Sequence, residues 1–220
     1  MKKAPQTIFA IVVLALVACV IMFICTMAYS GSTTQTSDNE ANGSSRPTDV
    51  IVYDKPQRVL PTYYQTDPAW SEIPYLTGTI GTHGCGLVCA SMAYCYIFDE
   101  EMTPDMVAAE VGDACSTDGV NDMLKFAEWL SSKSHGGLDL ARVWLLDYVK
   151  DYIGEDVLVF VGMSGMLGKR MYSSHVVLMH DMTESGASIN DPYDPDNTRR
   201  YTWQELDDAS FLYYVIVRVS

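Results

Sequence analysis

The sequence predicts an α+β domain in which a helical N-terminal half packs on a mostly antiparallel sheet. Helical patterns occupy residues 85–153, and runs rich in β-branched residues follow from residue 157 to the C-terminus. Helices followed by strands, rather than alternating with them, are typical of this class. Residues 51–220, about 170 in all, are enough for one domain with a substantial core.

Residues 1–30 predict a membrane anchor or signal segment. Lys2 and Lys3 precede an uncharged apolar run of 21 residues, 8–28. A helix of that length spans roughly 30 Å, the thickness of a bilayer core, whereas the apolar part of a cleavable signal has only about 7–15 residues. The positive end stays in the cytoplasm, so we expect a single-pass anchor with the C-terminal domain extracellular. Two alternatives stay open: cleavage after Ala28 or Ser30 would give a secreted protein, and lipid attachment at Cys19 would give a lipoprotein.

Residues 31–50 predict a disordered tether between this segment and the domain. The stretch is rich in Ser, Thr, Asn and Gly and has no aromatic residue. Such a composition buries too little apolar surface to fold. The globular domain is therefore predicted to be residues 51–220.

The first two predicted helices have clear start signals. Gly84 precedes a helix over Cys85–Phe98, whose small and apolar residues predict burial on nearly all sides. Thr103 and Pro104 then form a capping pair, with Thr at the N-cap and Pro at the first helical position.

Two more helices are predicted before the strands begin. One starts near Gly119 or Asn121 and has apolar residues at helical spacing between residues 123 and 130. The other covers residues 140–153.

The C-terminal half shows strand patterns separated by turn signals. The predicted strands are residues 157–161, 175–180, 187–190 and 211–219, with a short capped helix at residues 202–206.

Charge and cysteine content narrow the function classes. Beyond the apolar run the chain carries 12 basic and 28 acidic residues, a net charge of −16. Like charges repel, so nucleic acid is not an expected partner. No CxxC motif and no zinc-finger spacing occurs, and the acidic residues near the C-terminus match no EF-hand loop. We expect neither a metal nor a cofactor.

Cys85 is the candidate nucleophile. It lies between Gly84 and Gly86 at the start of a buried helix. Free N–H groups and the helix dipole favour a thiolate there, and the glycines allow close approach of a substrate and contacts to an oxyanion. A small buried cysteine at a helix start is the structural alternative.

His175 and Asp191 complete a predicted triad. His175 begins a core strand, from which an imidazole can project into a cleft and act as the base. Asp191 follows the next strand and can orient that imidazole. Each residue alone has a plain structural explanation, as a strand-end histidine and a turn aspartate. The order of cysteine, histidine and acid suits groups that meet in space.

A series of motifs resembles the bacteriocin-processing-like, or double-glycine-peptidase-like, cysteine peptidases of the papain-like superfamily. The series is Gln65-Thr66-Asp67-Pro68-Ala69-Trp70, Gly84-Cys85-Gly86, Thr103-Pro104, Ser174-His175-Val176-Val177 and Asn190-Asp191-Pro192. The resemblance implies a papain-like fold and a triad of Cys85, His175 and Asp191. It also implies an oxyanion contact from Gln65, although papain-like enzymes place this Gln six residues before the Cys, where this chain has Thr79. Leu87 and Val88 also depart from the family pattern, which often has Pro and a small hydroxyl residue at these two positions.

Together these observations predict an extracytoplasmic cysteine peptidase that hydrolyses peptide bonds through an acyl-enzyme. Its partners would be a peptide or protein substrate and the membrane. Two alternatives stay open: a catalytically inactive surface module that binds a peptide or protein, and a cell-wall amide hydrolase.

Overall fold

The computed structural model describes residues 58–135 and 137–219, all within one compact unit. The predicted anchor or signal segment (1–30), the tether (31–50) and the first residues of the predicted domain (51–57) lie outside the described residues. None of the helices in the described ranges is both long and apolar enough to cross a bilayer.

The N-terminal half is helical, as predicted. Its central helix has the predicted bounds, and residues 86–93 of it are all buried. Thr103 is the N-cap of the next helix and Pro104 its first residue, which also confirms the prediction. The helices of this half are α2 (Ile80–His83), α3 (Cys85–Phe98), α4 (Pro104–Val111) and α5 (Met123–Lys133).

The third predicted helix begins later than expected because a hairpin precedes it. Asp118 and Gly119 have φ angles of 53° and 74°, which form a tight turn between β3 (Ser116–Thr117) and β4 (Val120–Asn121). The helix α5 then starts at Met123, capped by the side chain of Asp122. A second small hairpin, β1 (Pro74–Tyr75) and β2 (Gly78–Thr79), precedes α2.

The C-terminal half forms a six-stranded sheet in the order β5-β10-β6-β7-β8-β9, with every neighbouring pair antiparallel. The four predicted strands are present, and the first two are longer than expected. The short helix after Thr202 is also confirmed, with that residue as its N-cap. The elements are β5 (Asp139–Val143), α6 (Leu146–Lys150), β6 (Val157–Leu167), β7 (Arg170–Thr183), β8 (Gly186–Asn190), η1 (Pro195–Asn197), β9 (Arg199–Thr202), α7 (Trp203–Asp208) and β10 (Phe211–Arg218).

The helix predicted over residues 140–153 is wrong for its first part. Residues 139–143 form the edge strand β5, and only Leu146–Lys150 is helical. Leu, Ala and Arg favour helices in isolation, but pairing with β10 overrides that weak preference.

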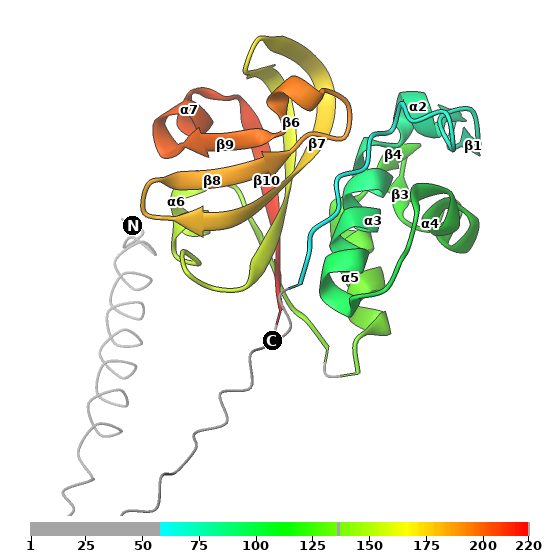
Figure 1. The fold of residues 1–220 in the computed structure, drawn as a ribbon, viewed down its shortest axis with the longest axis horizontal. Coiled ribbons are helices and arrows are strands. Elements are labelled where there is room, and N and C mark those ends of the chain that lie inside the picture. The colour runs from blue at the N-terminus through cyan, green and yellow to red at the C-terminus, as the bar shows by residue number, and fades with distance from the viewer. Residues whose placement is uncertain (1–57, 136, 220) are drawn as a thin grey trace, which may run out of the picture. The chain divides into compact units, whose positions relative to one another are not determined.

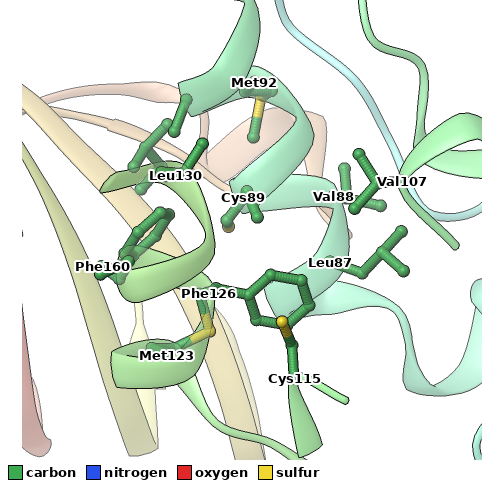
Figure 2. Packing of buried hydrophobic residues seen from close by; sticks show 14 of the residues in the cluster. Leu87, Val88, Cys89, Met92, Val107, Cys115, Met123, Phe126, Leu130 and Phe160 are labelled. Carbon is green, nitrogen blue, oxygen red and sulfur yellow. The ribbon is translucent and has the colours of Figure 1, made fainter. Parts of the chain in front are cut away.

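Apolar side chains cover both faces of the sheet. On one face Phe160, Leu178 and Val215 pack against α3 and α5, and Figure 2 shows Phe160 beside the helix side chains Cys89 and Phe126. On the other face Val159 and Ile216 pack with residues of α6 and α7. Figure 1 shows α2 to α5 gathered on one side of the sheet, with α6 and α7 on the opposite side. The helical half and the sheet therefore meet along α3.

Candidate active site

Cys85 is the first residue of α3, and its side chain is partly exposed. Steric limits explain the glycines beside it. A Cβ atom on Gly84 would come within 2.4 Å of the Ile80 carbonyl oxygen, and one on Gly86 within 2.7 Å of the Asn121 Cβ. Gly84 contributes no side-chain cap, so the N–H groups of the first turn have no side-chain acceptor at the N-cap. The sulfur therefore lies at the positive end of a 14-residue helix.

His175 lies on β7 and is paired with Asp191, which follows β8. The His175 Nε2 is 2.8 Å from the Asp191 Oδ1, and both side chains are buried. The Tyr172 ring stacks on the imidazole, with ring centroids 4.1 Å apart and planes 8° from parallel. Because Nε2 bonds to the acid, Nδ1 is the ring nitrogen left for Cys85.

Asp191 accepts hydrogen bonds from several groups besides His175. Its Oδ2 accepts from the Tyr172 hydroxyl at 2.6 Å and from the Asn197 Nδ2 at 3.2 Å. Its Oδ1 also accepts from the backbone N–H groups of Tyr193 and Asp194. The carboxylate is fully buried, so these donors replace the water that it loses on folding.

The ionisation of this pair follows from these contacts. Burial alone would lower the pKa of His175, but the hydrogen bond to Asp191 and the interaction with Cys85 outweigh it and raise the pKa to about 9. Burial would raise the pKa of Asp191, yet the hydrogen bond from His175 and the other donors hold it below its ordinary value. At neutral pH the pair is therefore an imidazolium and a carboxylate.

Cys85 and His175 line one cavity of about 350 Å³ between the helical half and the sheet. Gly162 on β6 and Tyr213 on β10 also line it, and a Cβ atom on Gly162 would come within 2.2 Å of the Tyr213 ring. Glycine at this position thus lets the tyrosine ring lie against the strand. A cavity of this volume is within the range of small-ligand sites, and Cys85 is among the residues that line it.

Asn121 is a site residue that sequence reasoning did not identify. Its Nδ2 lies 3.9 Å from the Cys85 sulfur and donates to the His83 carbonyl oxygen at 2.7 Å. Its Oδ1 accepts from the buried Tyr75 hydroxyl at 2.8 Å, which fixes the orientation of the amide. Asn121 lines the cavity with Cys85. The Asp118-Gly119 dipeptide is the sequence signal for the hairpin that places it there.

Gln65, in contrast, is not among the residues that line this cavity. It is buried, its Nε2 donates to the Gly81 carbonyl oxygen at 2.8 Å, and its Oε1 has no hydrogen-bond partner among the described residues. Its backbone N–H donates to the Pro192 carbonyl oxygen at 2.7 Å, which ties it to the loop after Asp191. Its oxyanion contact stays a prediction.

The other cysteines and His180 do not take part in the candidate site. Cys85, Cys89, Cys95 and Cys115 are all free thiols, and burial raises the pKa of Cys89 well above its ordinary value. His180 contacts Asn190 and Asp181 away from the cavity. Within residues 58–135 and 137–219 no three His, Cys, Asp or Glu side chains are grouped so as to hold a metal ion.

Comparisons with known proteins give structural neighbours only. No protein-family model matches the chain, and no curated protein does. One similar solved structure is a double glycine motif protease from an AMS/PCAT transporter in complex with the leader peptide. It is 18% identical with a TM-score of 0.42, over 62% of this chain and 84% of that one.

Two further solved structures have similar descriptions. The peptidase domain of Streptococcus ComA, a bi-functional ABC transporter involved in quorum sensing, is 14% identical with a TM-score of 0.43, over 63% of this chain and 93% of that one. A chain described as a C39-like peptidase from Bacillus anthracis is 12% identical with a TM-score of 0.46, over 74% of this chain and 96% of that one. The descriptions name the group that the sequence motifs resemble, but the similarity is low.

Proposed function

We propose that this protein is a cysteine peptidase in which Cys85 attacks the peptide carbonyl and His175 transfers the proton. The observation that carries the proposal is the shared cavity. It contains a thiol at a helix start and an imidazole whose Nε2 is hydrogen-bonded to a buried carboxylate. Nucleophile, base and orienting acid in this order form the arrangement that acyl transfer needs.

The proposed reaction starts from a Cys85 thiolate beside the His175 imidazolium. The thiolate adds to the carbonyl carbon of the substrate, and the imidazolium gives its Nδ1 proton to the leaving amine as the C–N bond breaks. The resulting thioester is attacked by water, from which neutral His175 takes a proton. Collapse of that intermediate breaks the C–S bond, releases the acid product and restores the ion pair. Asp191 stays ionised and holds the ring by Nε2 throughout.

Two amides are proposed as donors to the oxyanion, together with the Cys85 backbone N–H. Asn121 is supported by its position beside the sulfur and by the Tyr75 hydroxyl that fixes its orientation. Gln65 is supported by the resemblance of its motif. Its Nε2 uses one hydrogen on Gly81 and retains a second.

The extracytoplasmic location is a separate proposal, with the domain held at the membrane by the N-terminal segment. It is supported by the apolar run at residues 8–28 and by Lys2 and Lys3 before it. The proposed substrates are therefore peptides or proteins outside the cell.

The test of the function is hydrolysis of a mixed peptide library by the full-length chain, read by mass spectrometry. We expect new peptide ends with the wild type and none with Cys85→Ala. If the folded, reduced wild type cleaves nothing but captures a peptide or protein partner as well as Cys85→Ala does, the inactive binding module is favoured. Release of peptides from cell-wall material alone would favour the wall amide hydrolase.

Replacement of Asn121 tests its proposed role as an oxyanion donor. Loss of one such donor costs roughly 10²- to 10³-fold in kcat, so we expect Asn121→Ala to lower kcat by that order with little change in KM. Tyr75→Phe, which frees the amide, should cause a smaller loss. The measurement is steady-state kinetics on a peptide identified in the library.

Gln65→Ala is the matched comparison for Asn121→Ala. Thermal melts of both variants separate a loss of folding from a loss of catalysis. An Asn121→Ala enzyme that keeps wild-type kcat, while Gln65→Ala loses it, would remove Asn121 from the proposed oxyanion contacts and leave Gln65.

A further inference from the structure

Arg142 lies on the edge strand β5, and its side chain is on the helix-facing side of the sheet. It pairs with Val215 of β10, whose side chain is buried on that side. Residues opposite each other in an antiparallel pair share a face, as do residues two apart on one strand. Arg142 therefore shares this face with Tyr213 and Trp144, and it lines the cavity that contains Cys85.

Two aromatic rings hold the guanidinium in place. Its central carbon lies 4.7 Å from the Trp144 ring centroid and 5.0 Å from the Tyr213 ring centroid. The two rings meet edge to face, 6.5 Å apart. A guanidinium over ring faces keeps its N–H donors, which lie in its own plane, available for an acceptor.

Arg142 forms no hydrogen bond or ion pair with any residue in the described ranges. The other arginines there all donate to a carboxylate or a carbonyl oxygen: Arg58 to Asp156, Arg170 to Asp194, Arg199 to Glu205, Arg200 to Asp181 and Arg218 to Glu155. Among the described arginines Arg142 therefore stands apart, since it lacks such a partner and lines the cavity of the candidate active site.

Besides Arg142 and the His175 imidazolium, the charged residue that lines the cavity is Asp122, and both of its oxygens accept hydrogen bonds. Its Oδ1 accepts from the backbone N–H groups of Leu124 and Lys125, and its Oδ2 accepts from the Thr117 hydroxyl at 2.8 Å. Among the described residues Asp122 thus bonds to neutral donors and forms no ion pair with Arg142. The positive charge at this end of the cavity faces the space that a substrate would occupy.

We propose that Arg142 binds a carboxylate of the peptide substrate, so that the enzyme favours peptides with an acidic group a few residues from the cleaved bond. Arg142, Tyr213 and the region of Gly162 and His175 lie on successive strands β5, β10, β6 and β7. Three strand spacings of about 4.8 Å separate β5 from β7, roughly the length of four extended residues. The proposal deepens the proposed function and rests on it.

The test compares matched peptides with the full-length wild type. One arm replaces an internal Glu by Gln at each position around the cleaved bond, and the other replaces a free C-terminal carboxylate by an amide. We expect one arm to show a preference for the acid on the order of tenfold in kcat/KM, weaker at high salt. That arm identifies the carboxylate as a side chain or as the chain terminus.

Variants of Arg142 assign the preference to this side chain. Arg142→Gln should abolish it, Arg142→Lys should keep part of it, and Arg142→Glu should favour Lys over Glu in the peptide. Arg218→Gln is the control, because it removes the same charge at the other end of β10. Equal kcat/KM for acid and amide peptides with the wild type, or a preference unchanged in Arg142→Gln, would overturn the proposal.

Binding separates this proposal from the proposed function. Fluorescence anisotropy of labelled Glu and Gln peptides on the Cys85→Ala protein reports the carboxylate preference without turnover. If the wild type cleaves nothing, the peptidase proposal fails, and the binding ratio in Cys85→Ala with and without Arg142→Gln still decides the role of Arg142.

Discussion

Replacing either Cys85 or His175 by Ala should lower peptide turnover by about 10⁴-fold or more, and replacing both should cost little more than replacing one. The reason is that the two side chains line one cavity and act as a unit in the proposed proton transfer, so neither works without the other. The measurement is kcat/KM of the two single variants and the double variant on one peptide, with folding checked by thermal melts. If the loss of kcat/KM in the double variant equals the product of the two single-variant losses, the residues act separately.

The Asp191→Ala variant should lose roughly 3–5 kcal/mol of unfolding free energy, the usual cost of removing one partner of a buried ion pair. His175 would then be buried without its acid, and the Tyr172 hydroxyl would lose its acceptor. Asp191→Asn should cost less, and it should reduce turnover less than loss of Cys85 or His175, because it misorients the base without deleting it. Urea unfolding measures the free energies.

The stability contributed by this pair should depend on pH in a defined window. The pKa of Asp191 is lowered on folding, so its contribution is present above the ordinary value of 3.8 and is lost as the pH falls through the lower folded value. The pKa of His175 is raised, so its contribution is complete below 6.5 and is lost as the pH rises through about 9. The difference in Tm between wild type and Asp191→Asn should therefore be largest between about pH 4 and 6.5.

Asp196→Asn is the control for Asp191→Asn, because it changes an exposed carboxylate five residues further on, in η1. Its effect should stay within about 0.5 kcal/mol. A pH-independent Tm difference for Asp191→Asn would contradict the assigned ionisation of the pair.

Local signals predicted the elements that hold the proposed triad. The Gly84-Cys85-Gly86 triplet before an apolar run predicted α3 with its bounds, because helix starts and burial are determined by nearby residues. The β-branched run after His175 predicted the core of β7 in the same way. The spacing of cysteine, histidine and acid then made their meeting plausible, and the structure places His175 against Asp191.

Features that depend on distant pairing could not be predicted. The edge strand β5 has helix-forming residues and only partial burial, so its pattern resembles a surface helix until β10 pairs with it. For the same reason the position of Arg142 at the cavity was not predicted. Asn121 reaches Cys85 only because Gly86 leaves room for it and Tyr75 orients it. Gly86 precedes Asn121 by 35 positions in the sequence, and Tyr75 precedes it by 46. The donors around Asp191 likewise come from β7, η1 and the loop between β8 and η1.

The most direct measurement is the alkylation rate of each cysteine in the reduced full-length chain at pH 6, with iodoacetamide and peptide mapping by mass spectrometry. In the proposed mechanism Cys85 attacks as a thiolate beside the His175 imidazolium, so Cys85 should react roughly 10- to 100-fold faster than in His175→Ala. Cys89, four residues further along α3 and fully buried, should react slowly in both proteins. Equal rates at Cys85 and Cys89, or a Cys85 rate unchanged by His175→Ala, would contradict the assignment of Cys85 as a nucleophile activated by His175.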